Sequence, residues 1–500
     1  MYSKRNLTDK QLIYIQIFDA IDKMDRYDEK KIFKKFPNLT GSLLSNHKAN
    51  LYEQLLTSLR LLQHKTPSIR IKELISFSEV LLQKGLYQQS LGQLHKAKQL
   101  AIIHCTHILH LDILVLEKGI ESRYITRSHE QRALELIEES DQLRTKIKNE
   151  GLWSDLALNM YDRYLKLGHI KNEDDFKSVS KFFKSSLPKT EAAAGELSFY
   201  GNVYQLQSYV WFHYITQNFS TCYKYGLNWV NSFDENPSMK LSDPILYMKG
   251  LHNCLSALFY CTEVNRFKTK LAILDGFIYA HQASFNQNQA TLAFIYSETA
   301  RLNLYFLTGE FTLGAKYAIE FEVKMNQFKS RIDVHRILIF HYKLACLKFG
   351  CDDYKGSITH LNFIINHPSL SLREDIQCFA RILNLIAHYE LGNDELIEYQ
   401  IKTTYKFLLK LEEMQKVQIA ILNFLKASVN MNQDELLNYF TKLKLELEVI
   451  LEDRYERRPT LYLDIISWLE SKLTPRSVEL IIQRKRLGNG INNAQKRPLN

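Results

Sequence analysis

Hydrophobic and small residues recur along the chain at fixed offsets behind an aromatic residue. In the segment LLQKGLYQQSLGQLHKAKQLA, Tyr87 is followed by Ser90, Leu94 and Ala97, and Gly85 stands two positions before it. Offsets of 3, 7 and 10 fall on one face of an α-helix. The glycine provides the left-handed residue that ends a preceding helix. This pattern predicts two helices joined by a tight turn at Gly85, with the second helix burying the face behind Tyr87.

Related spacings occur further along the chain. Phe219, Phe267, Phe311 and Tyr354 are each followed by residues at the same offsets, and weaker copies start at positions 130, 170 and about 395. These anchors repeat with a period of roughly 40–49 residues, which is typical of stacked helix pairs. A single pair cannot bury its apolar face, so neighbouring pairs must cover it. We therefore expect an all-α fold in which helical hairpins stack into an α-solenoid.

The turn motifs resemble those of tetratricopeptide repeats (TPRs). Gly85-x-Tyr87-x-x-Ser90 and Gly309-x-Phe311-x-x-Gly314 look like the turn and second helix of such a repeat. The period is longer than the 34 residues of a standard TPR, and Lys270 and Glu130 stand where a small or aromatic residue is expected. The N-terminal segments also resemble a group of bacterial helical-repeat proteins of about 500 residues, a resemblance that implies no activity.

The two ends of the chain differ from the repeats. The N-terminal pattern predicts three helices, at about 9–24, 28–36 and 45–63, and the third carries Leu51, Leu55, Leu59 and Leu62 on one face. At the C-terminal end we expect two capping helices, the second with Thr474 as N-cap and Pro475 at its first position, followed by a disordered tail. The predicted regions are a basic helical bundle at 1–72, the repeat array at 73–455, the cap at 456–486 and the tail at 487–500.

Positive charge is concentrated at these two ends. The formal net charge is +10; residues 1–72 carry +7 and residues 484–500 carry +5, which leaves −2 for the rest of the chain. The repeats are therefore nearly neutral. The N-terminal helices therefore have two interpretations. One is a capping bundle with a solvated basic face, and the other is a helix-turn-helix-like DNA-binding module. The phosphate contacts of such a module would come from Lys30, Lys31, Lys34, Lys35, Lys48 and Arg60.

Cysteine usage and hydropathy indicate in which cellular compartment the protein is expected. Seven cysteines occur without a CxxC pair, which argues against a disulfide framework. The sequence has no run of 18 apolar residues and no apolar signal-peptide core. We expect a cytoplasmic protein that does not associate with membranes.

Motifs of catalysis are absent from the sequence. It contains no GxxxxGK[ST], GxGxxG, HExxH or GxSxG segment. His104, His107 and His110 follow one another at three-residue steps, but on one helix such steps turn the first and the last apart, so no metal site is predicted. We expect neither an enzyme nor a bound cofactor.

The sequence therefore favours a non-catalytic scaffold that binds a protein or peptide segment in the groove of the solenoid. The first helix of each pair would line this groove, and the candidate binding residues are Tyr204, Gln207, Trp211 and Asn303. Aromatic and amide side chains offer apolar contact together with hydrogen bonds to a peptide backbone. The alternative is a regulator that combines the DNA-binding module with a repeat domain sensing a peptide or partner.

Overall fold

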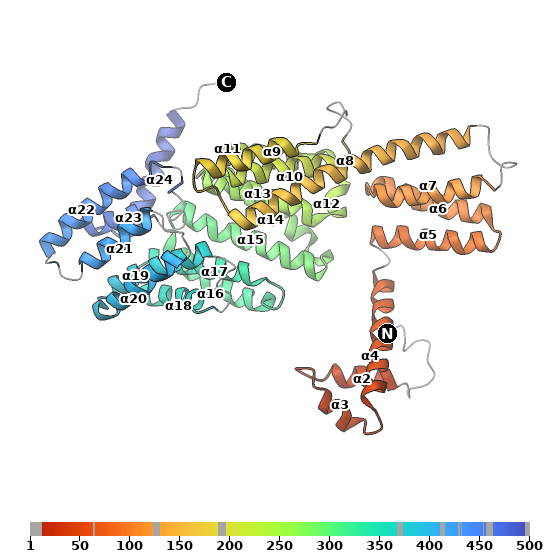
Figure 1. Cartoon of the computed structure of the whole chain (residues 1–500), viewed down its shortest axis with the longest axis horizontal. Helices are drawn as coiled ribbons and strands as arrows, with labels where there is room; N and C mark the ends of the chain where they lie inside the picture. Colours follow the sequence, from red (N-terminus) through yellow and green to blue (C-terminus); the bar gives the residue numbers. More distant parts are fainter. Residues whose placement is uncertain are drawn as a thin grey trace. The chain divides into compact units, whose positions relative to one another are not determined.

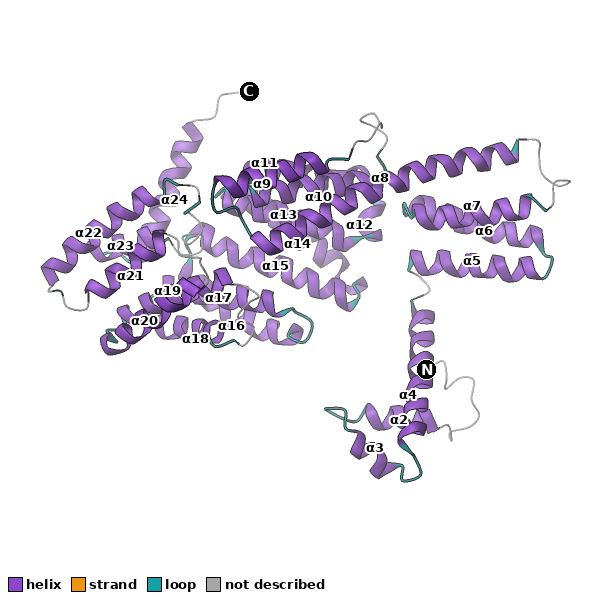
Figure 2. Ribbon diagram, in the orientation of Figure 1, coloured by secondary structure: helices purple, strands orange, loops and turns teal. Residues whose placement is uncertain are grey.

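The computed structural model describes residues 13–63, 66–123, 131–188, 197–367, 374–410, 416–428, 431, 433–453, 455–456 and 464–495. These residues form 23 α-helices, one short 3-10 helix and no β-strand (Figure 2). The predicted all-α class is confirmed for this part of the chain. Within it, no helix is both long and apolar enough to cross a membrane.

The chain divides into two compact units. Unit 1 comprises Met1–Asn149 and Ala194–Tyr200, and unit 2 comprises Glu150–Ala193 and Gly201–Asn500. The first division falls inside one 36-residue helix, α8 (Arg132–Leu167). The boundaries predicted from the sequence lie elsewhere, at 72, 455 and 486.

Unit 1 contains two groups of helices, each with its own core (Figure 1). In the first group, α2 (Ile13–Ile21), α3 (Glu29–Lys35) and α4 (Gly41–Leu62) share a core that includes Ile17, Ile32 and Leu44. The third helix begins earlier than predicted, because Thr40 caps it by accepting a hydrogen bond from the backbone N–H of Leu43. In the second group, α5 (Pro67–Gln83), α6 (Tyr87–Ile103) and α7 (His107–Glu121) enclose a separate core.

In unit 2, helices pack on their neighbours in the chain and also on their second neighbours. The odd-numbered helices α11, α13, α15, α17, α19 and α21 each contact the next of that series (Figure 1). The helices of this unit, after α8, are α9 (Glu173–Ser186), α10 (Phe199–Ile215), α11 (Phe219–Glu235), α12 (Ser238–Ser242), α13 (Pro244–Tyr260), α14 (Val264–His281), α15 (Gln287–Thr308), α16 (Phe311–Phe328), α17 (Val334–Gly350), α18 (Tyr354–Ile365), α19 (Glu374–Glu390), α20 (Asp394–Lys410), α21 (Lys416–Ser428), α22 (Gln433–Ile450), α23 (Ile465–Leu473) and α24 (Val478–Gln495), with the 3-10 helix η2 (Gln282–Ser284) after α14.

The periodic face predicted from the sequence is buried in four helices. In α6, α11, α16 and α18 the residues 3, 7 and 10 positions after the first residue of the helix are buried. They are Ser90, Leu94 and Ala97, then Cys222, Gly226 and Trp229, then Gly314, Ala318 and Phe321, and finally Ser357, Leu361 and Ile364. The amphipathic period alone therefore identified the inward faces of these helices.

Two predicted copies have the wrong register. Helix α14 begins at Val264, so Phe267 occupies the third offset and Lys270 does not belong to the buried set, which is Phe267, Leu271 and Leu274. In the copy at Glu130, the predicted inward residues are Ala133, Ile137 and Ser140. Of these Ser140 is buried, but its buried neighbours on α8 are Leu136 and Leu143. Ile137, predicted to be inward, is 51% exposed. Glu130 itself lies outside the described residues.

Left-handed residues end the helices before the anchors. Gly85 and Gly309 have φ values of 74° and 71°, as their positions predict. The same conformation occurs at Gln217 and Asp352, two residues before Phe219 and Tyr354, although these residues have side chains. The backbone requirement of the turn is thus met at sites where no glycine marks it.

The C-terminal helices differ in detail from the prediction. Thr474 ends α23, and α24 begins only at Val478, so the expected N-cap and first-turn proline lie between two helices. Trp468 on α23 is fully buried and donates from Nε1 to Glu390 at 2.6 Å. Gln483 on α24 donates to the carbonyl of Gly309 at 3.2 Å. Helix α24 continues to Gln495, within the range expected to be disordered, and residues 496–500 lie outside the described part.

Candidate functional site

The first predicted groove residues lie on α10. Gln207 is buried, and Tyr204 and Trp211 are half-buried. The Trp211 ring lies 5.1 Å from the rings of both Tyr161 and Tyr164 on α8, centroid to centroid. The indole Nε1 of Trp211 is buried and makes no hydrogen bond to any described residue. Tyr161 and Tyr164 of α8 therefore pack against this side chain, and its indole N–H is not exposed to solvent.

Tyr204 lies in an acidic neighbourhood. Burial raises the pKa of its phenol, and the charges of Asp243 and Glu150 act in the same direction. Asp243 is the N-cap of α13 and accepts from the backbone N–H of Leu246 at 3.0 Å. Tyr204 thus brings α10 close to the start of α13, one helix pair further along the chain.

A group of cations and aromatic rings continues from this point onto α13, α15 and α17. The ring of His252 on α13 stacks on Tyr296 of α15, with centroids 4.6 Å apart. Burial, together with the positive charges of Arg336, Lys343 and Lys249, lowers the pKa of His252 to about 3. The imidazole is therefore neutral at pH 7 and lies within the field of three basic side chains.

Lys249 and Arg336 are the half-buried cations of this group. We call the set of Lys249, His252, Tyr296 and Arg336 the inner basic face. Burial and the charge of Arg336 lower the pKa of Lys249, and Asp243 opposes this effect. Arg336 is paired with Asp333 at 3.1 Å. Ammonium and guanidinium groups donate strong hydrogen bonds to carboxylates and carbonyls. This arrangement is suited to an acidic or carbonyl-rich ligand.

Asn303, the fourth predicted groove residue, is committed to an internal contact. It is buried on α15, and its Oδ1 accepts a hydrogen bond from Nζ of Lys343 on α17. The Lys343 ammonium lies 5.7 Å and 5.8 Å from the ring centroids of Phe259 and Phe306. Burial lowers the pKa of Lys343 to about 7. This pair supports the inner basic face from within the core, and Asn303 is not presented to a ligand.

The predicted nucleic-acid residues lie in unit 1 and are not equivalent. Lys30, Lys31, Lys34 and Lys35 are exposed on the seven-residue α3, and none of their ammonium groups forms an ion pair with a described residue. Lys48 on α4 is instead tied to Glu29 at 2.6 Å and to the hydroxyl of Tyr27 at 3.0 Å. Arg60 is exposed on the same helix, about three turns further on. The four lysines of α3 therefore form the coherent part of this set.

The three-residue spacing of His104, His107 and His110 predicted that they lie on one helix, but they do not. His104 ends α6, Cys105 is in a left-handed conformation with φ of 51°, and His107 begins α7. His110 is buried, and its Nε2 lies 2.9 Å from Oε1 of Glu139 on α8. In the part of the chain that the structure describes, no group of three or more His, Cys, Asp or Glu side chains is arranged to hold a metal ion.

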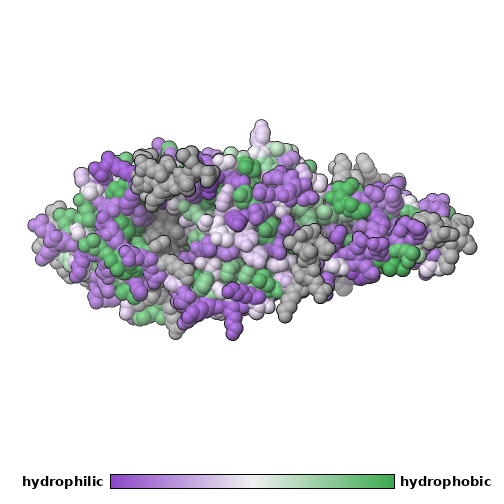
Figure 3. Space-filling model, turned by 90° about the horizontal axis from the view of Figure 1, so that it is seen from above, coloured by the Kyte–Doolittle hydropathy of each residue, from purple (hydrophilic) through white to green (hydrophobic). Residues whose placement is uncertain are grey.

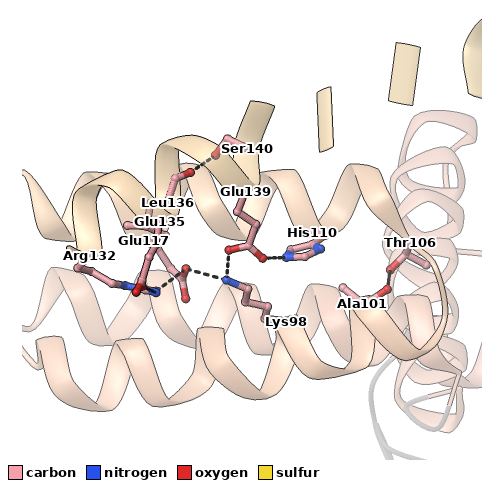
Figure 4. A network of polar contacts seen from close by, with 10 residues as sticks. All are labelled: Lys98, Ala101, Thr106, His110, Glu117, Arg132, Glu135, Leu136, Glu139 and Ser140. Atoms are coloured by element: carbon pink, nitrogen blue, oxygen red, sulfur yellow. Dashed lines mark hydrogen bonds and ion pairs between the residues drawn. The ribbon is translucent and has the colours of Figure 1, made fainter. Parts of the chain in front are cut away.

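Glu139 belongs to a network of charges that joins α6, α7 and α8 within unit 1 (Figure 4). Lys98 contacts Glu139 at 2.5 Å and Glu117 at 3.6 Å, and Arg132 contacts Glu117 at 3.1 Å. Lys98 and Glu139 are 41 positions apart in the chain, so no local motif identifies this network. Its members satisfy one another, and it holds the helices together.

Hydrophobic side chains on the face shown in Figure 3 occur as small separate groups among hydrophilic ones. Comparison of the chain with protein-family models, curated proteins and solved structures gives no match.

Proposed function

We propose that unit 2 is an α-solenoid of TPR-like hairpins and acts as a non-catalytic scaffold that binds a peptide or protein segment. The contacts between second-neighbour helices support this proposal, because they bring α11, α13, α15 and α17 side by side. In the same proposal, α2–α4 form an N-terminal bundle, and α23 and α24 cap the last hairpin.

The inner basic face is the observation on which the binding role depends. Lys249, His252, Tyr296 and Arg336 come from three helices of this series. Lys249, His252 and Arg336 are half-buried, and the Tyr296 ring that stacks on His252 is buried. Half-buried donors form stronger hydrogen bonds than fully solvated ones, because less water competes for the acceptor. An extended acidic segment crossing α13, α15 and α17 has the chemistry that this face recognises.

The test is a selection of peptides from a random library on the full-length protein. Binding of the enriched peptides is then measured by fluorescence anisotropy for wild type and for Lys249→Ala and Arg336→Ala. We expect acidic sequences, and at least a roughly tenfold loss of affinity in each variant, which corresponds to one charge-assisted hydrogen bond. Lys224→Ala is the matched control, because Lys224 is exposed on α11. Enrichment of no peptide, or equal affinity in all variants, would contradict the proposal.

The exposed lysines of α3 favour a second candidate, a regulator whose N-terminal helices bind DNA. Four unpaired ammonium groups on two turns of helix can neutralise backbone phosphates. The proposal predicts a gel shift on genomic fragments at roughly 150 mM salt that is lost in Lys31→Glu/Lys34→Glu and retained in Lys96→Glu, a reversal at an exposed lysine of α6. A shift that persists in the α3 variant would exclude this mode of binding.

A further inference from the structure

Helix α4 buries one face along its first half and has no buried residue after Leu51. Leu44 and Leu51 are buried in the core that α4 shares with α2 and α3. Beyond them the helix presents hydrophobic side chains to solvent. We call this set the α4 stripe, and its members, with their exposed fractions, are Tyr52 (64%), Leu55 (37%), Leu56 (47%), Leu59 (55%) and Leu62 (75%).

The spacing of the stripe is that of a helix–helix seam. Tyr52, Leu55, Leu59 and Leu62 alternate in steps of three and four residues, which corresponds to the a and d positions of two successive heptads. Leu56 lies beside this line. Apolar residues at a and d are typical of a helix that packs along its length against another helix.

Charge in this segment does not oppose self-association. Between Asn50 and Gln63 the chain carries one acid, Glu53, and one base, Arg60, so two copies of the segment meet without net repulsion. The basic residues of α3 and the start of α4 lie before this segment in the chain. A strongly charged partner would find no complementary charge on the stripe.

We propose that the α4 stripe pairs with the same stripe of a second copy of this chain. Each of the five side chains would remove roughly 100 Å² from water. Two copies would therefore bury about 1,000 Å² in total, which is the lower limit for a specific interface and is consistent with a weak, reversible dimer. A symmetric pairing satisfies both copies at once, because the same surface serves as its own partner.

The experiment is sedimentation equilibrium of the full-length chain from about 1 µM to about 200 µM. We expect a reversible monomer–dimer equilibrium in wild type, and a monomer throughout in Leu55→Asp/Leu59→Asp. Ile108→Asp is the control, because Ile108 is 71% exposed on α7 of the same unit and lies outside the stripe. This control should dimerise as wild type does.

Each alternative outcome is decisive. A wild-type chain that stays monomeric, or a stripe variant that still dimerises, overturns the proposal. Far-UV circular dichroism of the same samples shows whether the stripe variant is still folded. If the stripe variant loses helicity at all concentrations while the control does not, the stripe is packed within the chain and the proposal also fails.

Discussion

The side chain of Lys343 donates a hydrogen bond to Oδ1 of Asn303 in the interior of unit 2. Lys343 is 1% exposed and has aromatic rings on two sides. A charged ammonium is costly at such a site unless it is fully paired, and the acceptor here is a neutral amide.

This pair makes a testable prediction about pH. The pKa of Lys343 falls from 10.5 to about 7 because of burial. Between these values the unfolded chain binds a proton that the folded chain does not, so the unfolding free energy rises with pH from about 7 to about 10.5. The full contribution is of the order of 5 kcal/mol. Urea denaturation at several pH values should show this rise in wild type and its loss in Lys343→Met/Asn303→Leu. An unchanged slope would show that Lys343 is not the titrating group.

Two helical glycines, one closely packed and one facing open space, predict opposite effects of the same substitution. A Cβ at Gly350 would collide with the ring of Phe311, which is itself buried. We expect Gly350→Ala to lower the unfolding free energy by about 1–3 kcal/mol. Gly276 on α14 has nothing within 4 Å of its would-be Cβ, so Gly276→Ala should raise it by about 0.5–1 kcal/mol, the difference in helix propensity. Thermal denaturation of both variants tests this ordering.

The charge network of unit 1 should be sensitive to the loss of one partner. Glu117 is 5% exposed and contacts both Lys98 and Arg132. Glu117→Ala removes the buried partner of these cations but leaves Lys98 with Glu139 and Arg132 with Glu135, so we expect a cost of about 1.5–3 kcal/mol. Hydrogen exchange of α6, α7 and α8 should accelerate accordingly. Asp141→Ala removes an exposed pair with Arg144 and should cost less than about 0.5 kcal/mol. Equal effects would mean that the network is not buried.

Two histidines predict acid sensitivity of unit 2. His341 and His360 face each other with their Nδ1 atoms 3.1 Å apart, beside a cavity of about 280 Å³ bounded by α16, α17 and α18. Burial lowers the pKa of His341 to about 3, helped by His360 and Lys329, and that of His360 to about 4, helped by Lys348 and opposed by Asp353. The unfolded chain takes up these protons near pH 6.5.

The unfolding free energy should therefore decrease as pH falls from about 6.5 towards 4, because protonation favours the unfolded chain. His341→Gln/His360→Gln should flatten this part of the pH profile, and urea denaturation between these limits measures it. An identical profile in the double variant would assign the acid sensitivity to other groups. His252, whose pKa is also about 3, provides a further variant for comparison.

The sequence by itself determined the helices and the faces that they bury. Ser90, Leu94 and Ala97 were identified as inward, and Gly85 and Gly309 as left-handed ends, because both properties depend on residues within about three turns of one helix. The same local rule failed at Phe267, where α14 begins three residues before the aromatic residue, after a left-handed turn at Thr262 that no glycine marks.

Only the tertiary structure decided which polar side chains meet. Asn303 faces Lys343, and Lys98 faces Glu139, across 40 and 41 positions of sequence. Such pairings depend on how one helix lies against another, and the helical period does not encode this. The continuous α8 is a similar case, since it places Tyr161 and Tyr164 over Trp211. Helical faces follow from local spacing, whereas the neighbours of a buried polar group follow from packing between distant segments.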